Sequence, residues 1–207
     1  MITIIDYGLG NVQAIANIYH RLNIPVKFAR EPRALKDALK VILPGVGAFD
    51  WAMTRLNESG MRAALDALAR DSACDVLGIC VGMQMLARRS DEGELPGLGW
   101  VTGEVKLFEA GRFSDRTHLP HMGWNDVSPR AEDPLFEGLA EGARFYFLHS
   151  YYFQASSGTD VVATADYAGP FACAVRSGRV WGVQFHPEKS HQWGIRLLKN
   201  FAELGPC

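Results

Sequence analysis

Short apolar runs alternate, over the first part of the chain, with segments whose apolar positions recur at helical spacing. The runs predict buried strands, and the helical spacing predicts helices at 12–22 and 61–68. Alternating strands and helices with short connections build a mostly parallel sheet that is covered on both faces, so this pattern predicts an α/β fold. The strands predicted in this part are 2–6, 26–29, 40–43 and 74–79.

The pattern changes after about residue 97, where short apolar stretches separated by turn residues predict antiparallel strands. A helix follows at 191–204, with Ile195, Leu198 and Phe201 marking its buried side. No repeat, low-complexity tract or linker interrupts the chain, so we expect residues 1–207 to form a single domain. The strands predicted in this part are 100–107, 119–127, 144–149, 160–166 and 171–175.

Residues 78–82 read G-I-C-V-G, the pattern of a nucleophile elbow with cysteine as the nucleophile. The strand predicted at 74–79 precedes Cys80 and a helix predicted at 83–88 follows it. Cys80 would therefore sit on a sharp turn, for which the flanking glycines leave room. A thiol that points at a helix N-terminus is favoured as thiolate. The alternative is a buried cysteine that follows a core strand.

Residues 181–190, W-G-V-Q-F-H-P-E-K-S, offer a base for this thiol. A strand is predicted at 180–185, and His186 and Glu188 follow its end. A thiol nucleophile needs a base, and the base needs a group that fixes its tautomer. Residues two apart on an extended chain point the same way, and Pro187 stiffens that geometry. Taken alone, the segment could equally be a surface turn.

Together, the cysteine elbow and the H-P-E segment resemble the class I glutamine amidotransferase family, whose triad runs Cys, His, Glu along the chain. The resemblance implies a three-layer, flavodoxin- or Rossmann-like fold with a mostly parallel central sheet and an additional antiparallel strand region. It spans residues 5–190, nearly the whole chain. Further motifs resemble the branch of glutaminase subunits that serves histidine biosynthesis: 5–11, 43–49, 120–125 and 145–151.

The resemblance implies a reaction in which Cys80 attacks the side-chain amide carbon of L-glutamine. His186 takes the thiol proton and returns it to the leaving nitrogen, and Glu188 orients His186 and stabilises its imidazolium form. Water then cleaves the glutamyl thioester. The products are glutamate and ammonia.

The tetrahedral oxyanion of this reaction needs backbone donors. One is the N–H of Val81, which follows the nucleophile. We expect the second from residues 44–47, P-G-V-G, where the glycines, including Gly47, let the backbone approach a ligand. In relatives the donor is the N–H that matches Val46. An ordinary strand-to-helix turn would use the same residue types.

The resemblance also implies a set of residues that bind the substrate. The acidic residue that the resemblance implies is Glu92, but Asp91 and Glu94 are nearby, so one of them could be the residue that matches the family instead. His149 could equally be a core histidine with satisfied hydrogen bonds. The implied residues are Gln84, Glu92, His149, Ser150 and Tyr151.

Composition narrows the cellular setting. The net charge of −2 implies no polyanion, so we expect no nucleic-acid partner. No run reaches the roughly 18 apolar residues of a membrane span, and the apolar start at 1–5 is better interpreted as a first strand than as a signal peptide. The four cysteines, at 74, 80, 173 and 207, show no paired spacing, which suits a reducing cytoplasm. Cys173 lies in a predicted strand and is expected in the core.

His118 and His121 form H-x-x-H, a spacing that can bind a metal, and His149 and His186 could join them as ligands. On a strand, residues i and i+3 face opposite sides, so the pair would not converge. We therefore expect no metal and no cofactor.

The chain has no phosphate-binding loop and no region left over for an acceptor-binding domain. Ammonia would therefore pass directly to a partner, and the resemblance implies a heterodimer with a (β/α)8-barrel cyclase. Aromatic residues often anchor interfaces, so Trp124 and Tyr146 are candidates for the docking face. For Phe147 we expect core packing.

Three competing interpretations remain. The first is a paralogue in the same branch that supplies ammonia for amidination of a surface-polysaccharide sugar, which residues 17–24 and His191 favour. The second is a cysteine hydrolase of a related peptidase-like α/β fold, although such enzymes usually lack this His-x-Glu pair. The third is a binding module with a relict site. Glutamate release from glutamine separates the last two from an amidotransferase.

Overall fold

Five parallel strands form the centre of a ten-stranded sheet in the spatial order β2, β1, β3, β4, β12. The structure is a computed structural model that describes all residues except 72, 110, 112–116, 131, 140–141 and 206–207. β1, β4 and β12 are buried along their whole length, as strands covered on both faces should be. The bounds are β1 Ile2–Ile5, β2 Val26–Ala29, β3 Lys40–Gly45, β4 Asp75–Cys80 and β12 Val180–Val183.

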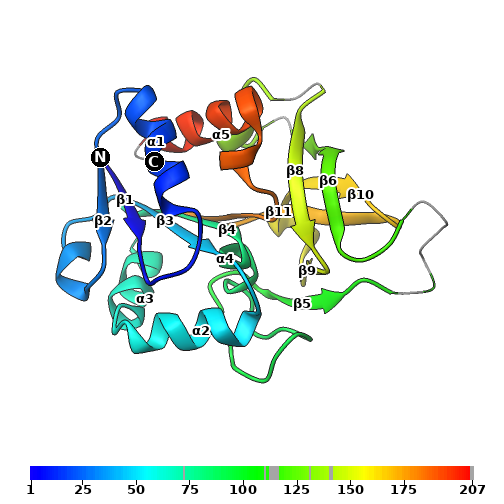
Figure 1. The fold of residues 1–207 in the computed structure, drawn as a ribbon, viewed down its shortest axis with the longest axis horizontal. Coiled ribbons are helices and arrows are strands. Elements are labelled where there is room, and N and C mark those ends of the chain that lie inside the picture. Colours follow the sequence, from blue (N-terminus) through cyan, green and yellow to red (C-terminus); the bar gives the residue numbers. More distant parts are fainter. Residues whose placement is uncertain (72, 110, 112–116, 131, 140–141, 206–207) are drawn as a thin grey trace.

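Helices cover both faces of these parallel strands. Figure 1 shows α1 (Val12–Arg21) and α5 (His191–Glu203) on one side, and α2 (Phe49–Glu58) and α3 (Arg62–Arg70) on the other. The side of α1 predicted to be apolar is buried, and the Tyr19 hydroxyl donates to the Leu198 carbonyl of α5 at 3.0 Å. The helix α2 was not predicted, although its buried residues recur at helical spacing: Phe49, Ala52, Met53 and Leu56.

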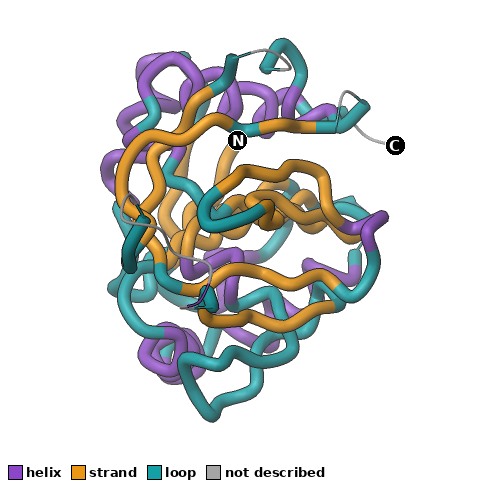
Figure 2. The backbone as a smooth tube through the Cα atoms, turned by 90° about the vertical axis from the view of Figure 1, so that its right-hand side faces the viewer, coloured by secondary structure: helices purple, strands orange, loops and turns teal. Residues whose placement is uncertain are grey.

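The second half of the chain builds the antiparallel part. Beyond β12 the sheet continues through three antiparallel strands, and β5 and β9 attach to it through β11. Two further strands, β6 and β8, form a separate two-stranded sheet. Figure 2 looks onto this strand-rich side. The bounds are β5 Gly103–Leu107, β6 His121–Asp126, β7 Ser128–Pro129, β8 Arg144–His149, β9 Tyr151–Ala155, β10 Val161–Asp166 and β11 Pro170–Ser177.

The predicted fold class is therefore confirmed: a mostly parallel central sheet between helices, with an additional antiparallel region. The predicted strands differ from those observed at their ends. The strand expected at 100–107 begins only at Gly103, and the one expected at 180–185 ends at Val183. The strand β9 was not predicted. Short 3-10 helices complete the described secondary structure: Pro32–Leu35, Pro134–Phe136, Gly158–Asp160 and Pro187–Lys189.

The helix predicted at 83–88 is wrong. The helix after β4 is α4, which spans only Val81–Gln84. The following backbone groups bond elsewhere, since the Met85 carbonyl accepts from Leu98 and the Arg88 N–H donates to Gly103. So short a helix has a small macrodipole, which weakens the predicted stabilisation of a thiolate.

Two expectations drawn from composition concern the cysteines and a membrane span. Cys173 lies fully buried in β11, as predicted, while Cys207 lies outside the described residues. Among the helices that the structure describes, none is both long and apolar enough to cross a membrane.

Candidate active site

Cys80 sits on the sharp turn that its sequence predicts. It is the last residue of β4, and its φ of 56° lies in the left-handed region that side chains other than glycine rarely adopt. Neighbouring glycines make the turn possible. A Cβ at Gly78 would lie 2.6 Å from the Gly82 carbonyl oxygen, and a Cβ at Gly82 would overlap the Leu43 carbonyl oxygen. The elbow is therefore pressed directly against β3.

His186 and Glu188 meet beside this cysteine. His186 lines the same cavity as Cys80, and its Nδ1 lies 2.9 Å from Glu188 Oε1. Parallel pairing of β12 with β4 brings the two segments together, because both strands end at the same edge of the sheet. Both acid–base side chains are almost fully buried, with 4% of His186 and 2% of Glu188 exposed.

Asn11 completes this arrangement from a third strand end. It follows β1, and its Nδ2 donates to Glu188 Oε1 at 2.7 Å. The sequence analysis placed Asn11 in a family motif at the end of the first strand but gave it no role. Asn11 follows a strand that ends at the site, and this position in the sequence could have indicated a role there.

The hydrogen bonds in this group set the protonation of its members. Burial alone would lower the pKa of His186, but hydrogen bonds with Cys80 and Glu188 raise it to about 10. Burial alone would likewise raise the pKa of Glu188, yet hydrogen bonds from His186 and Asn11 hold it below its usual range. The arrangement thus favours an imidazolium beside a carboxylate, and an imidazolium can give a proton to a leaving group.

A cavity of about 350 Å³ opens onto Cys80 and His186. The structure brings together around it all the residues predicted to form the oxyanion hole and to bind substrate. Glu188 is the one predicted triad member outside the lining, since it stands behind His186. The predicted residues that line the cavity are Val46, Gly47, Cys80, Val81, Gln84, Glu92, His149, Ser150, Tyr151 and His186, and those not predicted are Asn11, Pro120, Leu148 and Lys189.

The predicted oxyanion donors lie on adjacent strand ends. Gly45 is paired with Cys80 in the register of β3 and β4, so Val46 and Gly47 follow directly beside Val81. Val81 opens α4, and the first N–H groups of a helix have no partner within it. Gly47 adopts a φ of 84°, which a residue with a side chain would resist.

Glu92 is the acidic residue of its loop that faces the cavity. Its Oε2 accepts from the Phe49 N–H at 2.9 Å, and burial raises its pKa. The loop is tied to α2 a second time, because the Asp50 carboxylate accepts from the N–H groups of Glu94 and Leu95. Of the three acidic candidates in this loop, the cavity therefore favours Glu92.

His149 belongs to the wall and to the core at once. It is 6% exposed and lines the cavity, while its ring bonds to Tyr151 and His121. Gln84, opposite, donates to the Tyr151 carbonyl at 3.2 Å. His149 therefore lines the cavity and also has satisfied hydrogen bonds, as a core histidine would.

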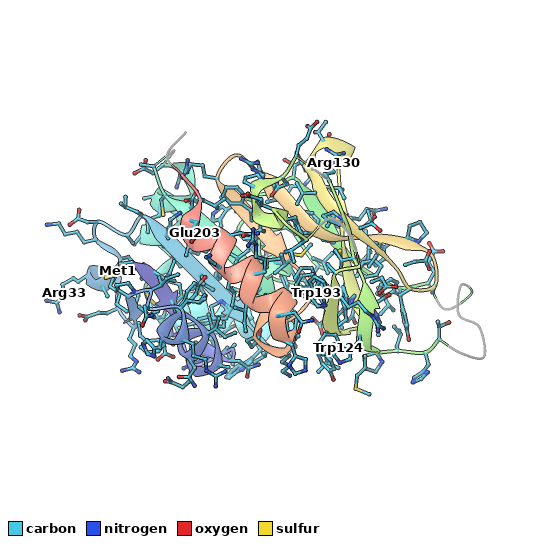
Figure 3. All side chains as sticks on the ribbon, turned by 90° about the horizontal axis from the view of Figure 1, so that it is seen from above. Met1, Arg33, Trp124, Arg130, Trp193 and Glu203 are labelled. Atoms are coloured by element: carbon cyan, nitrogen blue, oxygen red, sulfur yellow. The ribbon has the colours of Figure 1, made fainter. Side chains whose placement is uncertain are left out.

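Trp124 and Tyr146 pair across β6 and β8 on the outer face of the two-stranded sheet. Trp124 is 40% exposed and stacks on His191, the first residue of α5, with ring centroids 5.3 Å apart. Figure 3 labels Trp124 and also Trp193, which lies on α5. Met122 and Leu148 extend this exposed face, and Leu148 also lines the cavity. Phe147, on the other face, is fully buried as expected.

Two other features lie apart from this site. Within the described residues no group of three or more His, Cys, Asp and Glu side chains could hold a metal ion. His118 precedes β6 and only His121 lies on it, so the strand geometry that we assumed for this pair does not apply. A larger hollow of about 620 Å³ lies at the amino ends of β4 and β12, lined by charged residues and Trp100 but by no cysteine or histidine among its described residues.

Comparison with known proteins agrees with this architecture. The chain matches the family Glutamine amidotransferase class-I over residues 3–204. Among solved structures, a glutamine amidotransferase superposes with a TM-score of 0.76 at 22% identity, covering 98% of this chain and 97% of that one. PurLQS from Thermotoga maritima gives a TM-score of 0.70 at 19% identity, covering 98% and 97%. These likenesses show the fold.

Relatives with higher identity narrow the assignment. The imidazole glycerol phosphate synthase subunit HisH of Bdellovibrio bacteriovorus is 58% identical, over 99% of this chain and all of that protein. The HisH of Leptospira interrogans is 47% identical, and HisH 2 of Pseudomonas aeruginosa 45%, each over 99% of this chain and all of the relative. The chain belongs to the class-I glutamine amidotransferase family, in the branch of the HisH subunits of imidazole glycerol phosphate synthase.

Proposed function

We propose that this chain hydrolyses L-glutamine through a thioester on Cys80 and passes the ammonia to a HisF cyclase subunit for histidine biosynthesis. The observation that carries the proposal is the arrangement at the cavity, which Cys80 and His186 line together while His186 Nδ1 lies 2.9 Å from the buried carboxylate of Glu188. This is the geometry of a nucleophile, its base and the group that orients the base. No cofactor is needed, and we propose the cytoplasm as the compartment.

The first half of the reaction forms the thioester. Cys80 Sγ attacks the side-chain amide carbon of glutamine, and the thiol proton passes to His186. The negative oxygen of the tetrahedral intermediate accepts from Val81 N–H and from the backbone at Val46 or Gly47. His186 then gives its proton to the nitrogen, the carbon–nitrogen bond breaks, and ammonia leaves.

The second half releases glutamate. Water attacks the thioester carbon, His186 accepts a proton from the water, and the carbon–sulfur bond breaks to return Cys80. Glu188 keeps its negative charge throughout and stabilises each imidazolium. Gln84, Glu92 and the 149–151 segment hold the substrate by the contacts that they offer to its amide, ammonium and carboxylate groups.

We propose that the partner docks on the outer face of the β6–β8 sheet, around Trp124 and Tyr146. Exposed apolar residues on one face of a small sheet are typical of an interface core. Leu148 joins this face to the cavity, so a docked subunit would cover its mouth. Lys189 lies with its Nζ 5.5 Å from the Tyr146 ring centre and links this face to the triad segment.

A second candidate is the paralogue that feeds ammonia to a HisF-like partner for amidination of a surface-polysaccharide sugar. The observation that favours it is the likeness of residues 17–24 and His191 to that branch. The chemistry at Cys80 would be the same, and only the partner and the acceptor would differ.

Glutamate release tests both candidates. The chain is assayed with a HisF subunit, with and without imidazole glycerol phosphate, beside Cys80→Ala and the matched control Cys173→Ala, a buried cysteine away from the site. Stimulation by HisF that Cys80→Ala abolishes and Cys173→Ala preserves would support the histidine pathway. Cys80-dependent release that ignores HisF would favour the paralogue, and no release at all would refute the glutaminase.

A further inference from the structure

Two histidines lie directly opposite each other on the buried face of the β6–β8 sheet. His121 pairs with His149 in the strand register, and His121 Nδ1 lies 3.0 Å from His149 Nε2. The His121 ring is stacked between Phe147, at 4.7 Å, and Tyr167, at 3.9 Å between centroids. This sandwich holds the ring in one orientation, so its two nitrogens have fixed partners.

The partners determine where the hydrogens are. His149 Nδ1 lies 2.8 Å from the Tyr151 carbonyl oxygen, which can only accept, so Nδ1 carries the hydrogen. Burial lowers the pKa of His149 to about 3 and that of His121 to about 4, so both rings are neutral near pH 7. A neutral ring has one N–H, so His149 Nε2 must accept and His121 Nδ1 must donate.

The other nitrogen of His121 can be assigned in the same way. His121 Nε2 has no hydrogen and accepts from Asn125 Nδ2, 3.3 Å away. The orientation of this amide is set independently, because Nδ2 also donates to the Asp166 carbonyl at 2.8 Å. The result is one directed chain of hydrogen bonds from Asn125 through His121 and His149 to the Tyr151 carbonyl.

This chain ends in the wall of the glutamine pocket. The Tyr151 carbonyl that accepts from His149 also accepts from Gln84 Nε2, at 3.2 Å. His149, Ser150, Tyr151 and Gln84 all line the cavity beside Cys80. The two histidines of this chain are buried, so reversing the hydrogen bond between them would leave a buried polar atom unpaired, and this part of the chain is stiff.

We propose that His121 and Asn125 are positioning residues for glutamine binding, which they support through His149 and the Tyr151 carbonyl without touching the substrate. This inference rests on the proposed glutaminase function. It assigns both histidines the Nδ1–H tautomer, and it predicts that breaking the chain loosens the pocket wall rather than the catalytic group at Cys80.

The tautomers are measured directly by two-bond proton–nitrogen NMR spectra of the full chain labelled with 15N-histidine. His121 and His149 should both show protonated Nδ1 and should not titrate between pH 5.5 and 8. His20 and His118 are exposed and provide reference signals in the same spectra. An Nε2–H tautomer at either buried histidine would overturn the chain, whatever the enzyme does.

The functional arm uses His121→Phe, which keeps an aromatic ring between Phe147 and Tyr167 but removes the donor to His149. In the complex with HisF we expect the KM for glutamine to rise about tenfold, as losing one buried hydrogen bond implies, with kcat within about threefold. His121→Asn, whose amide can donate near the position of Nδ1, should recover part of the KM. His118→Gln is the matched control.

Asn125→Leu provides a second break should His121→Phe fail to fold, with an expected rise in KM of about threefold. Folded variants with unchanged KM would overturn the positioning role. Failure of the wild-type complex to release glutamate would instead refute the proposed function, and the NMR result would still decide the tautomers.

Discussion

Buried histidines occupy two regions of this molecule, and their surroundings drive protonation in opposite directions. At the carboxyl edge of the parallel strands, hydrogen bonds with Cys80 and Glu188 overcome burial and raise the pKa of His186 to about 10. On the two-stranded antiparallel sheet, burial lowers the pKa of His121 to about 4 and that of His149 to about 3. All three side chains belong to residues that are at most 6% exposed.

The difference lies in the partners. His186 faces ionisable groups, whereas the pair faces a carbonyl, an amide and each other. A carboxylate stabilises imidazolium, while neutral partners leave the desolvation cost uncompensated. Burial by itself therefore does not decide the charge of a histidine. One region favours a charged imidazolium, and the other favours two neutral rings.

The strongest test of this comparison removes the charge beside His186. Glu188→Gln keeps the shape of the side chain but replaces the carboxylate, so the pKa of His186 should fall and its tautomer should no longer be fixed. We expect glutamate release to fall by about 10³-fold or more, as for the orienting acid of other triads. Steady-state assays with HisF and an NMR titration of His186 measure both effects.

Glu137→Gln is the matched control, because its side chain is exposed and far from the cavity lining. It should leave the rate and the titration unchanged. Retention of most of the activity in Glu188→Gln would show that the charge beside His186 is dispensable, and the comparison would fail.

The backbone at the elbow offers the next largest effect. Gly82→Ala places a Cβ of the helix α4 against the Leu43 carbonyl of the buried strand β3, where neither element has room to move. We expect a loss of about 3 kcal/mol or more in the free energy of unfolding, measured by urea denaturation, together with a loss of activity. Gly158→Ala, with no atom near its added Cβ, should change both by little. Equal stability of the two variants would mean that the elbow is not tightly packed.

Stability against pH should separate the two histidine regions on the acid side. The folded pKa values of His121 and His149 lie below the unfolded value of about 6.5, so below that pH the unfolded chain binds protons that the fold excludes. Stability should therefore fall as pH drops from 6.5 towards 4, by about 3 kcal/mol at pH 5 for the two histidines together. His121→Phe should flatten this slope in urea denaturation; an unchanged slope would contradict the assigned shifts.

His186 should affect the free energy of unfolding at alkaline pH. Its folded pKa is raised, so its contribution is complete below pH 6.5 and is lost as pH rises towards 10. Between pH 7 and 9 we expect a loss of about 2 kcal/mol in the free energy of unfolding. His186→Gln should remove this dependence while leaving the acid slope intact. The same slope in both proteins would assign the effect to other groups.

The smallest expected effect concerns Asn11. Asn11→Ala removes one of the two hydrogen bonds to Glu188 Oε1, so the pKa of Glu188 should rise and its hold on His186 should weaken. We expect kcat to fall about tenfold, the equivalent of one hydrogen bond to a charged group. Asn17→Ala, on the exposed side of α1, is the control. An unaltered kcat would show that the hydrogen bond from Asn11 is not needed to hold Glu188 in place.

Local patterns in the sequence predicted most of the elements, and they singled out the three residues proposed as the triad, which the structure brings to one site. Parallel strands buried on both faces are visible as apolar runs, and glycines around Cys80 indicate a tight turn. The helix at 83–88 was predicted wrongly because its backbone groups bond to the segment at 97–103, which no local pattern reveals. The helix α2 was overlooked although its pattern was present. The single domain over 1–207 stays a prediction.

The sequence by itself determined the tight turn at Cys80, the spacing of His186 and Glu188, and the order of strands and helices, because these depend on neighbours along the chain. Only the tertiary structure decided that Asn11 reaches Glu188, 177 residues away, and that His121 meets His149. Such contacts depend on which strands lie side by side. Strand pairing places donors and acceptors from distant segments within hydrogen-bond range, and their partners then set the charge of each buried histidine.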